Sequence, residues 1–540
     1  MVEVTANNFN QLLPEILADI KSASFIAVDT EFTGLLSDEV FVGSLFDDGP
    51  HRYQKLISNM RRFSICQLGL AVFKGIPNVN KYTVTSYNFY LRPHSCNSFD
   101  PTFMCQASSL EFLQKYQFDF NKWLYGGITF MNTNEAEELR SDLLSFMQGN
   151  KGFRLSFEVQ DQLSNIGQWA ATAQEGDTTT CSVGHDITSQ VLLVASTHNK
   201  FTDLWAGIDN DQVVIKKVSA DERTRLEAQD PQSVDFVEGI VSRMQGFTTV
   251  FQYLAQHQKP IVFHNSLLDL LLIYKQFHRH LPQSYSAFKT DLHQMFPIIY
   301  DTKFIATELR YHYKEKDDEV SILFNNTSLY DLASSMKRAS SVLYKPSLIH
   351  HPPVNKYSGD KAVLHEAGYD AYVTGMCFLS MAHLYTMLMM TSRLQHRPLS
   401  PQEHVYALKN FANRVHIPRA TISYMELTGR DPRSKRPPWL LVEPRNRSVR
   451  VTPGMVSTTL AQYGSLDVIR RNNSSVLVAT ANWKCVRDIL MNLSEDSRMK
   501  AQLYKRLKHS PLIRTLAWSG ALVSTGFSAW IVYTTLRRTS

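Results

Sequence analysis

The sequence is poor in cysteine, and the cysteines that it has are scattered. Its 540 residues include six cysteines, with no Cys-x-x-Cys pair and no histidine at the spacing of a zinc finger. This pattern argues against a zinc finger and a disulfide framework and favours a reducing compartment. The N-terminus also lacks a basic leader and an unbroken apolar core. Residues 1–20 have the spacing of an amphipathic helix, so we expect no signal peptide there.

The sequence also lacks a strong excess of charge of either sign. It has 56 Lys and Arg and 50 Asp and Glu, which gives a net charge of +6. This mild balance is compatible with a polyanionic substrate but does not require one. A hydrophobic content of 44% with 20% charged residues excludes a disordered chain. The length predicts two to four domains, and no internal repeat is present.

Charge is absent from one long stretch near the end of the chain, "TLAWSGALVSTGFSAWIVYTTL" at residues 515–536. The stretch is about as long as a bilayer-spanning helix, and basic residues flank both of its sides. It predicts a single-pass tail anchor (511–540) after a basic juxtamembrane segment (501–510), on a cytosol-facing membrane, either the mitochondrial outer membrane or the endoplasmic reticulum. A buried or interfacial helix is the alternative, because Ser, Thr and Gly dilute the hydrophobicity.

Two carboxylates stand one residue apart in the apolar run "FIAVDTEFTGL" at residues 25–35. Alternate side chains of a strand share a face, so Asp29 and Glu31 point to the same side. Carboxylates this close repel each other, which raises their pKa values unless a positive charge lies between them. The pair is therefore either a solvated strand end or half of a cation site.

Two later acids suit the same cation site. Asp269 is the only acid in the apolar stretch "FHNSLLDLLLIY", which predicts a helix directly after a strand. Ser266 and Asp269 also form a Ser-x-x-Asp capping pattern, so capping is an alternative role. Asp370 lies in a helix that is apolar on nearly all sides, where a buried acid needs a partner. His365 precedes it by five residues, about 500° of helix, so we expect His365 on the loop that enters the helix.

The remaining pattern alternates strands with helices. Strands are expected at 63–74, at 82–93 and at "PIVFH", helices within 105–150, and one long helix from about 235 to 258. Residues from about 150 to 235 are polar and rich in Thr and Gln, which indicates a partly mobile insertion. A mixed sheet covered by helices is the expected class of fold. A basic, Pro-rich stretch at 429–439 precedes a region with a β-α-β-like rhythm.

The order of these motifs resembles the DEDDh family of 3′-to-5′ exonucleases. The stretches "DTEFTGL", "FQYLAQHQKPIVFHNSLLDLL", "NNTSLYDL" and "HEAGYDAYVTG" are similar to its deadenylase branch, the poly(A)-specific ribonucleases. The resemblance implies an RNase H-like α/β fold with an inserted small domain and a C-terminal α+β module, to which the uncharged terminal stretch adds a C-terminal transmembrane helix. The nuclease is then formed by residues 1–150 and 236–390. The insertion spans 151–235, in the position of a small nucleic-acid-binding domain, and residues 391–500 form a C-terminal region with an expected RRM-like module.

The resemblance also assigns roles to residues. Asp29, Glu31, Asp269 and Asp370 become the ligands of two Mg²⁺ ions, which Mn²⁺ can replace, and His365 becomes the general base. Two such ions, about 3.5 to 4 Å apart, activate the attacking water and stabilise the leaving 3′ oxygen. The product is a nucleoside 5′-monophosphate. Phe32, Asn265 and Lys303 match family positions near the substrate.

Two departures from the family pattern bear on the substrate. Basic residues do not cluster in the insertion, and residues 446–495 contain no aromatic run of the kind that stacks bases. With the predicted anchor, these features resemble the membrane-anchored branch that trims precursors of PIWI-interacting RNA. That branch implies a single-stranded RNA 3′ end carried by a PIWI-type protein, and a membrane adaptor. A homodimer, as in the soluble relative, is an expectation that the sequence leaves open. A poly(A)-specific mRNA deadenylase and a catalytically dead, membrane-tethered RNA-binding scaffold are the alternatives.

Overall fold

The chain folds into two compact units in this computed structural model. The first unit comprises Met1–Val42, Pro50–Ile417 and Tyr424–Pro432, and the second comprises Gly43–Gly49, Pro418–Ser423 and Arg433–Ser540. The structure describes residues 1–35, 43–77, 79–96, 99–147, 155–183, 187–209, 212–230, 235–314, 317–338, 345–351, 365–389, 398–446, 450–505, 519, 523–530 and 534.

A mixed sheet forms the centre of the first unit. Its strands run in the order β1 (Val2–Val4), β4 (Lys81–Tyr90), β3 (Ile65–Gly75), β2 (Phe25–Phe32), β8 (Ile261–Phe263) and β9 (Ile299–Asp301), and β10 (Ser347–His350) pairs with β4. β3 is antiparallel to β2 and β4, whereas β8 and β9 are parallel to β2. The predicted mixed α/β class is therefore confirmed.

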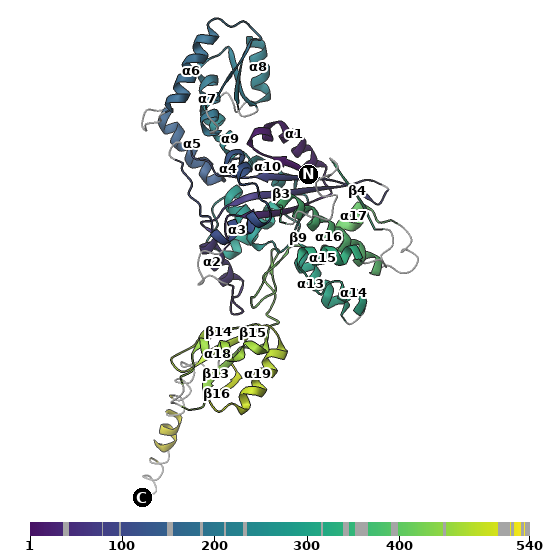
Figure 1. Ribbon diagram of the computed structural model, residues 1–540. Helices are drawn as coiled ribbons and strands as arrows, with labels where there is room; N and C mark the ends of the chain where they lie inside the picture. Colours follow the sequence, from purple (N-terminus) through teal and green to yellow (C-terminus); the bar gives the residue numbers. More distant parts are fainter. Residues whose placement is uncertain are drawn as a thin grey trace. The chain divides into compact units, whose positions relative to one another are not determined.

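Helices cover both faces of this sheet (Figure 1). α1 (Ala6–Ser22) and α10 (Thr248–His257) lie on one side, and α13 (Thr302–Tyr313), α15 (Leu329–Arg338) and α16 (Ala367–Met389) lie on the other. Phe25 and Ala27 of β2 belong to the core on the α16 side, where the Phe25 ring packs 5.1 Å from that of Phe378. The alternation of β2 therefore points Asp29 and Glu31 toward α16 as well.

α16 is apolar on nearly all sides because it is a core helix. Among the described residues it is the one helix whose length and composition would suit a membrane span, and it is mostly buried within the fold. A Cβ at Gly375 would lie 2.2 Å from the ring of Phe73, so the helix approaches β3 closely at that point. The hydrophobicity of α16 thus reflects packing against the sheet.

The prediction of a single long helix over residues 235–258 is wrong. The structure has α9 (Phe236–Gln245) and α10, separated at Gly246, which has a φ of +41°. A Cβ there would lie 2.3 Å from the carbonyl oxygen of Thr129. Only glycine suits this left-handed conformation and close approach, so one amphipathic pattern covers two helices.

The insertion is more regular than the sequence indicated. Its described part contains α6 (Phe157–Ala170), β5 (Thr178–Cys181), α7 (Ile187–Lys200), β6 (Leu204–Asp209), β7 (Gln212–Lys217) and α8 (Ala220–Gln229). The strands form an antiparallel sheet in the order β5-β7-β6. A core of its own, which includes Val159, Leu163, Val213 and Ile215, is buried among these elements. The polar surface sequence hid this core, so the expectation of an irregular segment is corrected for the described residues.

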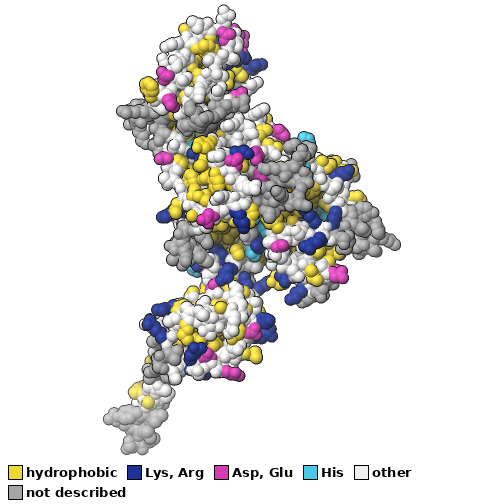
Figure 2. All heavy atoms as spheres, viewed as in Figure 1, with side chains coloured by type: hydrophobic (Ala, Val, Ile, Leu, Met, Phe, Trp, Pro, Cys, Tyr) yellow, Lys and Arg dark blue, Asp and Glu magenta, His cyan; other side chains and the backbone are white. Residues whose placement is uncertain are grey.

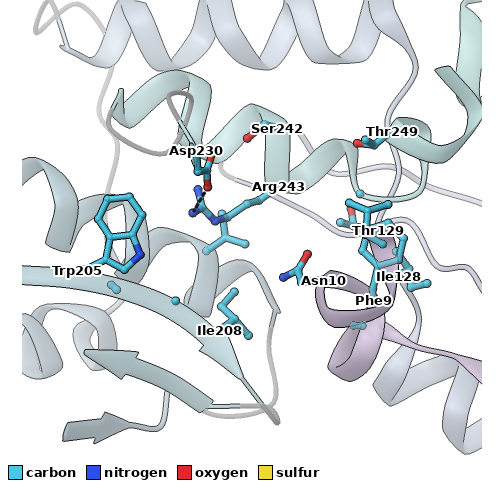
Figure 3. Close-up of a pocket in the computed structure, with 16 residues that line it drawn as sticks. Phe9, Asn10, Ile128, Thr129, Trp205, Ile208, Asp230, Ser242, Arg243 and Thr249 are labelled. Carbon is cyan, nitrogen blue, oxygen red and sulfur yellow. Dashed lines mark ion pairs between the residues drawn. The ribbon is translucent and has the colours of Figure 1, made fainter. Parts of the chain in front are cut away.

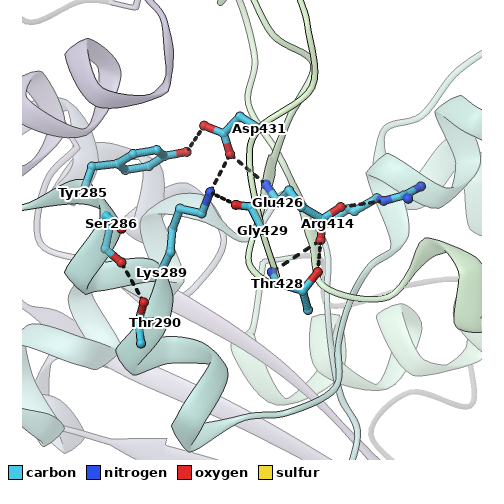
Figure 4. A network of polar contacts seen from close by, with 9 residues as sticks. All are labelled: Tyr285, Ser286, Lys289, Thr290, Arg414, Glu426, Thr428, Gly429 and Asp431. Carbon is cyan, nitrogen blue, oxygen red and sulfur yellow. Dashed lines mark hydrogen bonds and ion pairs between the residues drawn. The ribbon is translucent and has the colours of Figure 1, made fainter.

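Further elements complete the first unit. They are α2 (Gly49–Met60), α3 (Ala107–Lys115), α4 (Phe120–Gly126), α5 (Thr133–Met147), α11 (Leu267–Ile273), α12 (Tyr285–Met295), α14 (Asp318–Ile322), α17 (Pro401–Ala407) and the antiparallel pair β11 (Arg414–His416) and β12 (Tyr424–Glu426). The residues after β12 are fixed to α12 by a polar network (Figure 4). Asp431 accepts hydrogen bonds from Lys289 Nζ and the Tyr285 hydroxyl, both at 2.8 Å.

The second unit is a small α+β fold. Its elements are β13 (Leu440–Pro444), α18 (Pro453–Leu460), β14 (Leu466–Arg470), β15 (Val476–Thr480), α19 (Trp483–Glu495) and β16 (Met499–Leu503). The strands pair antiparallel in the order β14-β15-β13-β16. This is the β-α-β-β-α-β arrangement of ferredoxin-like folds.

The predicted membrane span at 515–536 lies largely outside the described residues. Within it, residues 523–530 are helical. The side chains of Val523, Phe527 and Trp530 are exposed there.

Candidate active site

Strand β2 carries the first two acids toward the start of α16. Asp29 pairs with Gly69 of β3, and Glu31 pairs with Gln67 before the register shifts at Phe32. A Cβ at Gly69 would lie 1.9 Å from the carbonyl oxygen of Ala367. Because Gly69 has no side chain, the first turn of α16 can lie directly over the strand beside Asp29.

Polar side chains of the sheet also hold the start of α16. The amide of Ala367 donates to Gln67 Oε1 at 2.9 Å, and the amide of Gly368 donates to Asn88 Oδ1 at 3.1 Å. These bonds satisfy helix amides that have no partner within the helix. They fix the turn that carries Asp370.

His365 lies on the loop that enters α16, where the sequence placed it. Its φ of +63° is left-handed, and its backbone amide donates to the Tyr330 hydroxyl at 3.1 Å. The same hydroxyl donates to Asp370. The ring of His365 packs against Tyr116 at 4.0 Å and Phe112 at 4.7 Å between centroids. Tyr330 thus links the histidine to the acid, a role that the sequence pattern does not predict.

Asp269 reaches the site from the first turn of α11. Its Oδ1 accepts a hydrogen bond of 2.6 Å from the hydroxyl of Thr30, which faces the other side of β2 from Asp29. The alternative capping role is not what the structure shows, because the Ser266 side chain makes no cap hydrogen bond. Its hydroxyl donates to Asp301 instead. The orientation of Asp269 therefore comes from Thr30.

The carboxylates form one electrostatic cluster. One ligand atom each from Glu31, His365 and Asp370 lies within 4.8 Å of the others. Burial raises the pKa of Asp29 well above its usual value, and the carboxylates of Asp370, Asp269 and Glu31 raise it further. Burial also raises the pKa of Glu31, with added repulsion from Asp370 and Asp269. The four predicted acids therefore repel one another within a single site.

The pKa values of the remaining two acids, Asp269 and Asp370, are also raised. Burial raises the pKa of Asp269 to about 7, although the Thr30 hydrogen bond opposes the rise. Burial likewise raises the pKa of Asp370 to about 7 against the bond from Tyr330. In the described part of the chain, no Lys or Arg forms an ion pair with any of the four acids. Closely spaced carboxylate oxygens without an internal cation suit Mg²⁺ or Mn²⁺.

His365 has the protonation state that a base needs. Burial, together with the positive charge of Lys115, lowers its pKa from the usual value. The imidazole is therefore neutral at pH 7 and can accept a proton. Its position within 4.8 Å of Glu31 and Asp370 places it beside the acids.

The other three predicted residues are less directly placed. Phe32 ends β2 and pairs with Ile65 beyond the register shift. Asn265 has a φ of +63° and donates its amide to Asp301. Lys303 lies in the first turn of α13, and its amide also donates to Asp301. No hydrogen bond or ion pair described in the structure brings the Lys303 side chain to the four acids.

A cavity that none of the predicted site residues lines is shown in Figure 3. It has a volume of about 480 Å³ and is lined by parts of α1, β6, α9 and α10. Arg243 and Asp230 form a 3.8 Å ion pair at its wall. The cavity shares no residue with the predicted site.

The sheet of the second unit offers no aromatic platform in its centre. Leu441, Leu477 and Ala479 alternate with the core residues of β13 and β15, and all three are buried. On the edge strand, Asp467 accepts the amide of Leu45 at 2.6 Å and pairs with Arg419. The RRM mode of RNA binding uses exposed aromatics on the central strands, and these two strands present none.

Comparison with known proteins gives the family. Residues 4–378 match the CAF1 family ribonuclease. The chain belongs to this family, and the predicted exoribonuclease class is confirmed.

Three relatives share most of their length with the chain. Poly(A)-specific ribonuclease PNLDC1 of Mus musculus is 33% identical over 97% of this chain and 98% of its own. Pre-piRNA 3′-exonuclease trimmer of Bombyx mori is 28% identical over 98% of both chains. Poly(A)-specific ribonuclease PARN of Xenopus laevis is 30% identical over 81% of this chain and 70% of its own. The predicted resemblance to the poly(A)-specific ribonucleases is therefore confirmed.

Proposed function

We propose that this ribonuclease trims single-stranded RNA from its 3′ end and that its substrates are precursors of PIWI-interacting RNA. One observation carries the catalytic part of the proposal. Asp29, Glu31, Asp269 and Asp370 converge beside a neutral His365, and the described residues supply no counter-charge. An arrangement that is costly without a cation fits a metal-dependent nuclease.

The side chains have separate roles in the proposed reaction. The four acids hold two divalent cations, Mg²⁺ or Mn²⁺, which when bound neutralise phosphate charge and lower the pKa of water. His365 accepts the proton of the attacking water. Tyr330 holds Asp370, and Thr30 holds Asp269, so both acids keep their orientation. The reaction releases nucleoside 5′-monophosphates.

Two observations favour delivery of the RNA by a partner. The buried aliphatic centre of the second-unit sheet gives no platform for stacking bases. Residues 433–505 contain thirteen Lys and Arg against five Asp and Glu, and Figure 2 shows basic side chains on the visible face of this unit. Such charge attracts RNA without reading its sequence. We therefore propose that a PIWI-type protein carries the RNA and that a membrane adaptor raises its effective concentration.

The proposed domain arrangement follows the predicted boundaries. Residues 1–150 and 236–390 form the nuclease, 151–235 the insertion, 391–500 the RRM-like region, and 511–540 a single-pass tail anchor on a cytosol-facing organelle membrane. Truncation after Ser510 tests the anchor, because the shortened protein should stay in the supernatant and remain active. Sedimentation of the truncated protein with membranes would contradict the anchor. Light scattering on the same protein tests the expected homodimer.

A digestion series tests the proposed activity. The full-length protein should shorten RNA of mixed sequence from a free 3′ hydroxyl, in the presence of Mg²⁺, and should not act on a 3′-blocked RNA. The variant Asp29→Ala with Glu31→Ala is the control, and trimming that survives it would contradict the proposed site. A poly(A)-specific deadenylase is the second candidate, favoured by the name of the mouse relative. Strict dependence on adenosine would support that alternative.

A further inference from the structure

Asp301 is a fully buried carboxylate that the proposed reaction does not use. It ends β9 and is the register partner of Phe263 at the end of the parallel strand β8. The two strands are parallel neighbours, so the loops that follow them leave the same edge of the sheet. The loop after β8 leads to α11 and Asp269, whereas α13 begins directly after Asp301 at the end of β9.

Both oxygens of Asp301 accept several hydrogen bonds. Oδ1 accepts the amides of Asn265 and Lys303, each at 3.0 Å, and of Phe304 at 3.3 Å. Oδ2 accepts the amide and the hydroxyl of Ser266, both at 3.2 Å, and the amide of His416 at 3.0 Å. Six donors thus converge on one carboxylate, from three separate segments of the chain.

A helix cap explains only part of this arrangement. The bonds from Lys303 and Phe304 cap α13. Asp235, which caps α9, accepts two bonds of the same kind, and both reach its Oδ1. Asp301 accepts four more, which come from residues 265–266 and from His416. Three of these four additional bonds therefore come from the loop that leads to Asp269.

That loop needs to be held. Asn265 has a left-handed φ of +63°, a conformation that costs a residue other than glycine about 1 kcal/mol or more. A second contact fixes the same loop, because the His264 ring and the Thr302 hydroxyl lie within hydrogen-bond distance at 2.9 Å. Ser266 is the last residue before α11, three positions ahead of Asp269. The position of Asp269 thus depends on a loop whose conformation Asp301 stabilises.

We propose that Asp301 is a positioning residue of the active site, which fixes the loop at 264–266 and so places Asp269 for metal binding. This inference rests on the proposed function, because it needs Asp269 to be a metal ligand. Mutation of a residue that orients a metal ligand commonly lowers metal affinity or activity by about 10- to 100-fold. Thr30 orients the carboxylate of Asp269 itself, whereas Asp301 positions the backbone that carries it.

Asp301→Asn separates capping from positioning. An amide has one acceptor oxygen, and with that oxygen in the Oδ1 position the cap of α13 and the Asn265 bond remain. The NH₂ group then faces the backbone amides of Ser266 and His416, which can only donate, so the hydrogen bonds from these two amides are lost. Asp235→Asn is the matched control, because its cap uses one oxygen only.

The measurements are kcat and KM on RNA with a free 3′ end, Mn²⁺ affinity by electron paramagnetic resonance, and the unfolding temperature, all on the full-length protein in detergent. Asp301→Asn should lower kcat and Mn²⁺ affinity by about 10- to 100-fold and leave KM for RNA within about twofold. Asp235→Asn should match the unsubstituted protein in kcat and Mn²⁺ affinity. Unchanged kcat and Mn²⁺ affinity in a folded Asp301→Asn protein would overturn the inference.

Two further variants keep the outcome clear. Asp269→Asn should abolish trimming and weaken Mn²⁺ binding. If it does neither, the proposed function fails, whereas failure of Asp301→Asn alone rejects only the positioning role. If Asp301→Asn does not fold, Ser266→Ala removes a single donor, and we expect kcat to fall by about threefold. An unchanged kcat in Ser266→Ala would then reject the inference.

Discussion

The acid cluster and the Asp431 network are both largely enclosed by protein, but they solve the problem of buried charge differently. Asp431 has a lysine within 2.8 Å, and the side chains of Lys289 and Asp431 are only 10% and 17% exposed. Among the residues that the structure describes, no Lys or Arg forms an ion pair with Asp29, Glu31, Asp269 or Asp370, and these acids lie near one another, His365 and neutral donors such as Thr30 and Tyr330. A buried carboxylate that the fold neutralises is structural, whereas carboxylates that the fold leaves uncompensated need a cation from outside.

The largest expected effect comes from removal of half of the uncompensated cluster. Asp29→Ala with Glu31→Ala should lower the trimming rate by at least about 1,000-fold, because both cations lose ligands. The unfolding temperature in EDTA should not fall, because two mutually repelling carboxylates are gone. Rate assays and thermal unfolding on the same preparation check both outcomes. A large loss of stability would mean that the acids are structural, like Asp431.

Substitution of Gly69 should move Asp370 on α16 relative to Asp29 and Glu31 on β2. Gly69→Ala places a Cβ against the carbonyl of Ala367, so the start of α16 must shift and carry Asp370 with it. Overpacking costs about 1 to 3 kcal/mol, and a shift of about 1 Å can cost about 100-fold in rate. Gly207→Ala is the control, because a Cβ there meets nothing within 4 Å. Equal rates for the two variants would contradict the role of Gly69.

Loss of the Lys289–Asp431 ion pair should lower the stability of the fold but should not change the rate of the reaction. Lys289→Met leaves Asp431 buried without its cation and should cost about 3 to 5 kcal/mol of unfolding free energy. The rate per folded molecule should not change. Lys216→Met tests the same kind of contact at the surface, because Lys216 pairs with Glu222 at 2.8 Å but is 40% exposed, and it should cost at most about 1 kcal/mol. Denaturant unfolding of both variants provides the comparison.

How far the sequence predicts these regions depends on how local their signals are. The Asp-x-Glu face of β2 follows from strand alternation, and the loop position of His365 follows from its spacing to Asp370. The bond from Thr30 to Asp269 joins residues 239 positions apart, so no periodicity reveals it. Tyr330 and Asp301 were missed for the same reason. Gly246 shows a second limit, because its amphipathic surroundings continue smoothly across a break that only the contact with Thr129 requires.

The pH dependence of stability should also distinguish the cluster. Asp269 and Asp370 have pKa values of about 7 in the fold and ordinary values near 4 when unfolded. The folded protein therefore binds more protons between these limits, and its stability falls as pH rises from about 4 to 7 in EDTA. His264, which is partly buried, and His404, which is buried, have pKa values lowered to about 4 and act in the opposite sense over part of this range. Subtraction of the stability measured without Mg²⁺ from the stability measured with Mg²⁺, at each pH, removes the contribution of the two histidines. A stabilisation by Mg²⁺ that does not grow with pH would contradict the raised pKa values of Asp269 and Asp370.

A smaller loss of rate than that of Gly69→Ala is expected for Tyr330→Phe. The change removes the hydroxyl that donates to Asp370 and accepts the His365 amide. The loss should cost about 1 kcal/mol of stability and about tenfold in rate. Tyr369→Phe is a neighbouring control on α16 that leaves the bond to Asp370 in place. Equal rates for the two variants would remove Tyr330 from the site.

The most direct test of the central claim is the effect of Mg²⁺ on the unfolding temperature of the full-length protein and of the Asp29→Ala, Glu31→Ala variant. If the cluster takes its counter-charge from bound cations, Mg²⁺ should raise the unfolding temperature of the unsubstituted protein in a concentration-dependent way. The shift should be lost in the variant. An equal shift in both proteins, or none in the unsubstituted protein at pH 8, would show that these carboxylates do not hold the metal.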